Sequence, residues 1–129
     1  MKTEIKSAVL SFFRILGRQY GKAFRRKGIA AHYLKGIGIE IGGLHNPLEV
    51  TSSARVKYVD RLPIEVLKDH YPELLGDTLI SPDIIDDGER LESVPDSSQD
   101  FIIANHFLEH TQNPILVIQN FFRKLKPGG

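Results

Sequence analysis

The sequence predicts an α/β protein in which a parallel sheet carries helices on both faces. Short apolar runs, typical of buried strands, alternate with segments of helical periodicity. The runs are mainly apolar, and residues 101–104 are apolar throughout, as is usual for strands of a parallel sheet that is covered on both sides. The 129 residues are 41% hydrophobic and 26% charged, which indicates one globular domain and argues against disorder.

The first 36 residues form a basic segment ahead of an acidic body. Residues 1–36 carry nine Lys or Arg and one acidic residue, whereas residues 37–129 carry eight basic and fifteen acidic residues. Because the excess of positive charge lies in this segment alone, no binding of nucleic acid by the whole chain is expected. Apolar residues recur in it at helical spacing, namely Ile5, Val9, Phe12, Phe13 and Leu16. This basic helical arm either lies on a membrane surface or packs on the body, and a second helical piece is expected to end at Gly28.

The body, residues 37–129, opens with two strands and a helix. Residues 37–41 are a β-branched run that Gly42 and Gly43 end. Residues 56–59 form the second strand, which ends at Asp60. A helix follows from Pro63 and stops at Tyr71-Pro72.

Two further strands and one helix complete the predicted elements. Residues 78–80, extended to 84–85, are expected to form the third strand, and the apolar residues 101–104 the fourth. Asn113 caps the last helix and Pro114 starts it. Its apolar residues along one face are Ile115, Ile118, Phe122 and Leu125.

The strand ends suggest a ligand that contains adenosine. In parallel sheets ligands bind at the carboxyl ends of the strands. A glycine turn at Gly42 lets a ligand approach the backbone, and Asp60, twenty positions after Glu40, can accept both ribose hydroxyls. These features fit either a dinucleotide or S-adenosylmethionine.

The glycine turn separates the two ligands. The dinucleotide pattern G-x-G-x-x-G is absent, because Leu44 and Pro47 stand at the expected glycine positions. The segment from Gly42 to Arg55 holds one or two helical turns at most, whereas a pyrophosphate needs a helix N-terminus. S-adenosylmethionine has no phosphate and is therefore favoured.

The motifs IEIGG, YVDR, DDGERLESVPDSSQDFIIANHFLEH and LKPGG resemble, in this order and spacing, the class I S-adenosylmethionine-dependent methyltransferases. The resemblance covers about residues 37–129 and implies the Rossmann-like fold of that family, with strand order 3-2-1-4-5-7-6. The variant GLHNPL further resembles a bacterial branch linked to surface-polysaccharide synthesis. The chain then corresponds to the N-terminal, cofactor-binding half, truncated after about four strands.

The resemblance also implies roles for individual residues. Glu40, Gly42 and Gly43 match the first motif, beside the methionine part of the cofactor, and Asp60 matches the ribose acid. The pair at the adenine edge is Asp87 and Gly88, and Asn105 lies where the family lines the centre of methyl transfer. Leu44 and Asn46 replace the family's second and third glycines. Asn46 is a partial substitute, since Asn tolerates left-handed backbone.

The histidines after the fourth strand allow two interpretations. His106 to His110 spell H-x-x-E-H, a zinc-protease motif, but it follows a strand directly and no third ligand lies downstream. No metal is therefore expected. His106 lies nearer the strand end and is the candidate general base for a hydroxyl acceptor, whereas His110 is interpreted as structural.

Taken together, the sequence predicts a methyltransferase that uses S-adenosylmethionine, with a glycan or small metabolite as acceptor and little activity from these residues alone. The alternative is a non-catalytic interaction module whose basic arm docks on a membrane or a protein. The edge of the fourth strand invites a homodimer. The absence of Cys excludes disulfides and a thiol nucleophile. With no apolar stretch of ~18 residues, the cytoplasm is the expected location, with or without peripheral membrane contact.

Overall fold

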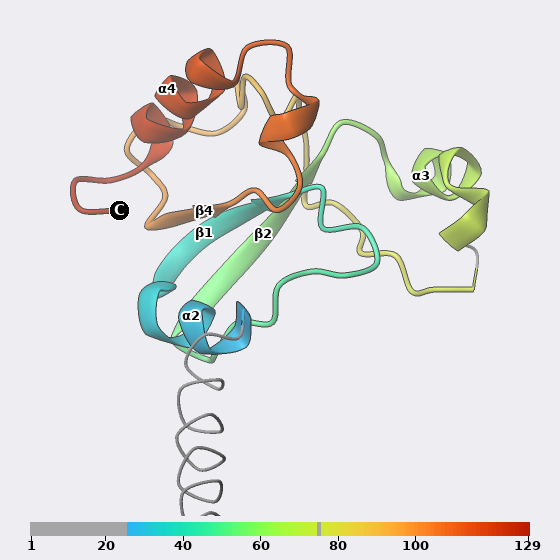
Figure 1. Ribbon diagram of the computed structural model, residues 1–129, viewed down its shortest axis with the longest axis horizontal. Helices are drawn as coiled ribbons and strands as arrows, with labels where there is room; N and C mark the ends of the chain where they lie inside the picture. The colour runs from blue at the N-terminus through green and yellow to red at the C-terminus, as the bar shows by residue number, and fades with distance from the viewer. Residues whose placement is uncertain (1–25, 75) are drawn as a thin grey trace, which may run out of the picture.

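The computed structural model describes residues 26–74 and 76–129. The helix expected from Ile5 to Leu16 lies outside these residues. The described chain forms one four-stranded sheet in the order β3-β2-β1-β4, with every neighbouring pair parallel. This order matches the first four strands of the family order that the sequence resemblance implies. Figure 1 shows the sheet between α2 on one side and α4 on the other.

The elements follow the predicted alternation of strands and helices. Their bounds are α2 Arg26–Tyr33, β1 Gly36–Ile41, β2 Ala54–Asp60, α3 Ile64–His70, the 3-10 turn η1 Pro72–Leu74, β3 Ile84–Ile85, β4 Phe101–Ile103, the 3-10 turn η2 Leu108–His110, and α4 Pro114–Lys124. β1 is the central strand, since it pairs with β2 from Gly36 to Ile41 and with β4 from Gly38 to Glu40. No described helix is long and apolar enough to cross a membrane.

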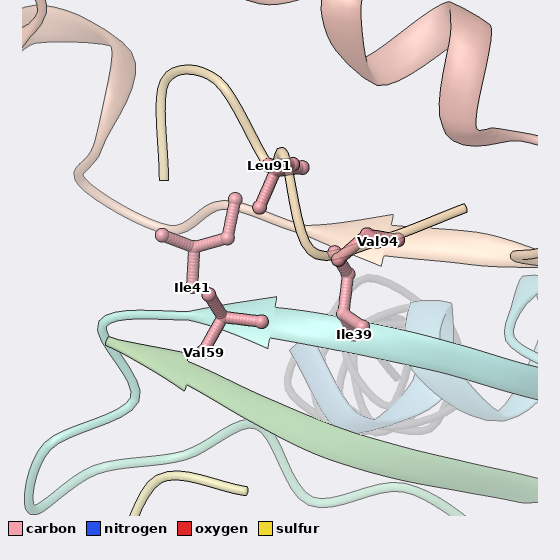
Figure 2. Close-up of a cluster of buried hydrophobic side chains, with 5 residues drawn as sticks. All are labelled: Ile39, Ile41, Val59, Leu91 and Val94. Atoms are coloured by element: carbon pink, nitrogen blue, oxygen red, sulfur yellow. The ribbon is translucent and has the colours of Figure 1, made fainter. Parts of the chain in front are cut away.

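Two apolar clusters, one on each face of the sheet, hold the helices. The first joins β1 and β2 to the loop that follows β3, and Phe121 of α4 packs against it. Its buried members, which point toward one another in Figure 2, are Ile39, Ile41, Val59, Leu91 and Val94. The second consists of Ala54, Phe101 and Ile103, with Leu34, just after α2, packed against it. The predicted two-sided cover is therefore confirmed.

Two predicted element bounds are wrong. The helical piece expected to end at Gly28 continues to Tyr33, because Ala30 is buried and this packing outweighs the low helix propensity of glycine. The third strand includes only Ile84 and Ile85. Residues 78–80 are not a strand; the Ile80 N–H donates instead to the Leu44 carbonyl at 2.8 Å, outside the sheet.

α4 begins as predicted but packs through a different face. The Asn113 side chain accepts a hydrogen bond from the Leu116 N–H at 3.1 Å, as expected of a helix cap. Ile115, Ile118 and Phe122 are 69%, 53% and 79% exposed, so the apolar side named in the sequence points away from the sheet. The buried side carries Val117 and Lys124.

Candidate functional site

A cavity of about 300 Å³ lies where the chain leaves the carboxyl ends of β1, β2, β3 and β4. This is the position that parallel sheets use for ligands, and the volume is at the lower end of the ~300–1,000 Å³ common for small-molecule sites. The cavity is lined by Ile41, Gly42, Val59, Asp60, Arg61, Tyr71, Asp87, Gly88, Glu89, Phe107, His110 and Thr111.

Asp60 brings a carboxylate to the cavity from the last position of β2. It is half-buried, and burial raises the pKa of its carboxyl, with the Leu62 N–H, which donates to Asp60 Oδ1 at 3.4 Å, offsetting part of this rise. The backbone around it is fixed, because the Asp86 N–H donates to the Asp60 carbonyl at 3.0 Å. The ends of β2 and β3 are thereby held together.

Asp87 and Gly88 line the cavity from the turn that follows β3. The Asp86 carboxylate organises this turn by accepting from the Asp87 N–H and the Ser93 N–H, both at 2.7 Å. Asp87 Oδ1 accepts from the Glu89 N–H at 2.8 Å. The Asp87 carboxylate is thus positioned at the cavity by hydrogen bonds within its own loop.

Gly88 allows close packing of the aromatic floor. A Cβ atom at this position would lie 2.6 Å from Ile41 Cγ2 and 2.9 Å from Phe107 Cζ, closer than real Cβ atoms come. The Phe107 ring stacks on Phe121 with 6.2 Å between ring centroids. Gly88 therefore lets Phe107 close the floor of the cavity above the core.

Three of the predicted cofactor residues do not line this cavity. Glu40 is only 2% exposed, and its two carboxylate oxygens accept from the Leu48 N–H. Burial raises the pKa of Glu40, while Leu48 and the Asn105 side chain lower it in part. Gly43 lies against Tyr58, where an added Cβ would be 3.2 Å from Tyr58 Cδ1. Glu40, Gly43 and Asn105 are thus absent from the cavity wall that Gly42, Asp60, Asp87 and Gly88 share.

The glycine turn achieves its shape through an unexpected residue. Gly42 has a φ of 64° and Leu44 a φ of 44°, so both occupy the left-handed region that favours glycine. Asn46, predicted to be the tolerant position, is not among the positive-φ residues of the described chain. The turn is instead closed by the Asn46 N–H, which donates to the Gly43 carbonyl at 3.0 Å.

The structure does not place His106 in the cavity. Its side chain is 91% exposed and its Nδ1 lies 3.2 Å from Glu109 Oε1. The left-handed backbone at His106, with a φ of 50°, turns the chain directly after β4, so nearness to the strand end did not bring the ring inward. His110, interpreted from the sequence as structural, lines the cavity instead.

Several lining residues were not found from the sequence. Arg61 directly follows Asp60 and Val59 directly precedes it, so the end of β2 could have indicated both residues. Tyr71 had no such signal, because it follows α3 rather than a strand. Within residues 26–74 and 76–129, no group of three or more His, Asp or Glu side chains is placed to hold a metal ion.

The lining residues fit the adenosine part of S-adenosylmethionine. Asp60 and Asp87 can each accept a hydrogen bond from a neutral donor, which the ribose hydroxyls and the adenine amino group supply. Ile41, Val59 and Phe107 provide an apolar surface for the ring. Among the residues that the structure describes, Arg61 is the single Lys or Arg that lines the cavity, so these residues form no basic cluster suited to a pyrophosphate.

The comparisons with known proteins support the fold described above. The model of a family described as a methyltransferase domain matches residues 25–129. An X-ray structure of an arsenic(III) S-adenosylmethionine methyltransferase from Chlamydomonas reinhardtii is similar in fold, with a TM-score of 0.54 and 24% identity. The match covers 77% of this chain and 38% of the algal one. A search of curated proteins finds no match.

The family match includes α2 as well as the sheet, since it begins at residue 25. The family match supports S-adenosylmethionine as the cofactor, and the algal structure supports the fold. Because the family match extends over most of the chain, this protein belongs to the methyltransferase-domain family.

Proposed function

We propose that the chain binds S-adenosylmethionine with its adenosine part in the cavity between the strand ends, as the cofactor half of a methyltransferase. Asp60 accepts hydrogen bonds from the ribose hydroxyls, and Asp87 accepts from the adenine amino group. The observation that carries this proposal is that both carboxylates, from different strand ends, line one cavity together with Gly42 and Gly88. When bound, the cofactor supplies an activated methyl group on a positively charged sulfur.

The methionine part of the cofactor is assigned to the other side of the glycine turn, near Glu40, Gly43 and Asn105. This assignment follows the family resemblance and is supported by the position of Glu40 beside the turn, through its bond to Leu48. We propose a glycan or a small metabolite as the acceptor, with a hydroxyl group that a general base deprotonates. Neither histidine is assigned that role, because His106 is 91% exposed and His110 lines the cavity proposed for adenosine.

The acceptor of the algal enzyme is not proposed for this chain. Trivalent arsenic is a soft acceptor that thiolates bind, and the 129 residues contain no Cys. The chain also spans only 38% of the algal structure. We therefore propose cofactor binding, without complete methyl transfer, for these residues alone.

Calorimetric titration with S-adenosylhomocysteine tests the proposal. Binding with one site per chain, and no binding of NAD under the same conditions, is the expected result. A silent titration by a folded chain would contradict it and favour the alternative of a non-catalytic interaction module. A methyl-transfer assay with S-adenosylmethionine and glycan acceptors tests the proposal that these residues alone do not complete methyl transfer. No turnover is expected in this assay.

Two partner surfaces belong to the same proposal. Residues 1–36, with a net charge of +8, are proposed to contact anionic membranes; vesicles should bind the chain at low salt and release it at ~0.5 M salt, where screening is strong. β4 is the last strand of the described sheet, and a homodimer through its edge should appear as a dimer mass in sedimentation. Absence of either result removes that partner without affecting cofactor binding.

A further inference from the structure

We infer that Tyr71 stacks on the adenine ring of the cofactor and is a binding residue for it. The inference rests on the proposed adenosine site and adds a residue that neither the strand ends nor the family motifs indicate. Tyr71 reaches the cavity from the segment between α3 and η1. Figure 1 shows α3 to one side of the sheet, away from α2 and α4.

A purine in the cavity needs flat surfaces on which to stack. Among the described residues, and apart from the imidazole of His110, two aromatic side chains line the cavity, Tyr71 and Phe107. Purine rings bind proteins largely by stacking on aromatic faces. In the described part of the chain, these two rings are therefore the candidates for the stacking surface.

Phe107 is already engaged by the protein. Its ring is stacked on Phe121, with an angle of 24° between the planes, and it packs against the cluster that contains Ile41. Gly88 leaves it just enough room, as the short distance from an added Cβ to Phe107 Cζ shows. Phe107 consequently serves as part of the floor, and at least one of its faces is covered by Phe121.

Tyr71 is fixed in place without being used by the core. Its N–H donates to the Leu67 carbonyl at 3.0 Å and its carbonyl accepts from the Leu74 N–H at 2.9 Å. Leu67 is 2% exposed and anchors α3, whereas Tyr71 is half-buried and belongs to neither apolar cluster. Its aromatic neighbour, His70, meets it edge to face at 76°, a geometry that does not cover both faces of the tyrosine ring.

The two carboxylates set where the purine lies relative to Tyr71. The Asp60 carbonyl and the Asp86 N–H are bonded, so the ribose acid and the neighbouring adenine-edge acid, Asp87, are close together in one rigid strand-end unit. A nucleoside that reaches both acids spans this unit and presents its ring faces to the remaining walls. Tyr71 forms one of those walls and is the aromatic residue that the core leaves free.

The experiment compares Tyr71→Leu, Tyr71→Phe and the control Tyr33→Ala in the full chain. Tyr33 is 73% exposed and is not a lining residue. Titration with S-adenosylhomocysteine and with adenosine should show that Tyr71→Leu weakens both by on the order of tenfold. Tyr71→Phe, which keeps the ring, should bind like the wild type, as should Tyr33→Ala. Circular dichroism confirms that each variant is folded.

Tyrosine fluorescence gives a second readout that does not depend on catalysis. The chain has four Tyr and no Trp, so its emission comes from tyrosine. Adenosine should change the emission of the wild type and of Tyr33→Ala, and this change should be lost in Tyr71→Leu.

Three outcomes would overturn the inference. Equal affinity of Tyr71→Leu and the wild type for both ligands would show that the ring contributes no stacking. A loss confined to S-adenosylhomocysteine, with adenosine unaffected, would place Tyr71 at the methionine end. If the folded wild type binds neither ligand, the proposed function itself is contradicted. This outcome is recognised because the control and all variants then also show no binding.

Discussion

Both carboxylate oxygens of Glu40 accept a hydrogen bond from the backbone N–H of Leu48, with the nitrogen 3.0 Å from Oε1 and 3.1 Å from Oε2. The contact joins the centre of the sheet to the far end of the glycine turn, eight positions along the chain. No helix follows this turn within residues 42–53. A buried carboxylate therefore holds the turn in the place where related folds commonly rely on a helix.

Replacement of Glu40 should change both stability and its dependence on pH. Glu40→Ala leaves the Leu48 N–H without its acceptor and should lower the free energy of unfolding by about 1–3 kcal/mol. Burial raises the pKa of Glu40 above 4.5, so the folded state binds the proton more tightly than the unfolded state. Wild-type stability should then fall as pH rises from about 4.5 through the raised pKa.

Glu40→Gln isolates the pH-dependent contribution of Glu40 to stability, because the glutamine amide oxygen still accepts a hydrogen bond from the Leu48 N–H but does not titrate. The free energy of unfolding of Glu40→Gln, minus that of the wild type, should grow over this pH range and then level off. Urea denaturation at a series of pH values measures it. A difference that is constant with pH, or that shrinks as pH rises, would refute the assignment.

Loss of the Asp60 carboxylate should weaken cofactor binding without unfolding the protein. Hydrogen bonds to a charged acceptor contribute roughly 1.5–3 kcal/mol each, so Asp60→Ala should lower affinity for S-adenosylhomocysteine at least tenfold. Because burial raises the pKa of Asp60 above 3.8, wild-type affinity should fall on acidification from a pH above that value. Asp60→Asn should remove most of this pH dependence. Calorimetry with unchanged affinity would exclude the ribose role.

Asp87 should determine the preference for adenine. Inosine analogues replace the amino donor with a carbonyl acceptor, so the wild type should bind S-adenosylhomocysteine more tightly than its inosine analogue. Asp87→Ala should lose most of that preference, about 1–2 kcal/mol. The ratio of the two affinities is the relevant quantity, since Asp87 also accepts from the Glu89 N–H and its removal loosens the turn for both ligands. Equal binding of both analogues by the wild type would be incompatible with this role.

Glycine at position 88 should be required for packing. In Gly88→Ala the new methyl group meets Ile41 Cγ2 and Phe107 Cζ, and overpacking of this kind should lower stability by about 1–3 kcal/mol. Gly76→Ala is the matched control, because nothing lies within 4 Å of its Cβ position; its effect should stay within about 0.5 kcal/mol. Thermal denaturation of both variants makes the comparison, and equal melting temperatures would contradict the packing argument.

The sequence was most informative where a pattern has one physical cause. Runs rich in apolar and β-branched residues predicted β1, β2 and β4, and Asn113-Pro114 located the start of α4 because both residues suit a helix terminus. The range predicted for β3 was too long, since Ile80 bonds to Leu44 rather than to a strand and β3 contains only Ile84 and Ile85. Contacts between residues that are distant in the sequence decide whether a short apolar run joins the sheet, and these contacts produce no local sequence pattern.

The candidate site was predictable only in part for the same reason. Gly42, Asp60, Asp87 and Gly88 follow strand ends and meet at the cavity. The exposed position of His106 depends on a single left-handed residue, and the packing face of α4 depends on which apolar side meets Phe107 and Leu91. Tyr71 follows the end of α3, and the hydrophobic periodicity of the sequence does not indicate which way the chain turns there.

The pairing of β1 with two partners has a kinetic consequence. Gly36 pairs with Ala54, whereas Gly38 pairs with Phe101, more than three times as far along the chain. Closing the longer loop costs about 1 kcal/mol more in chain entropy, which favours early pairing of β1 with β2 and late addition of β4. The cavity draws on residues from 41 to 111 and is complete only after that last step. A ligand that needs the finished cavity therefore binds the native state and not the earlier intermediates, and it should slow unfolding far more than it speeds folding.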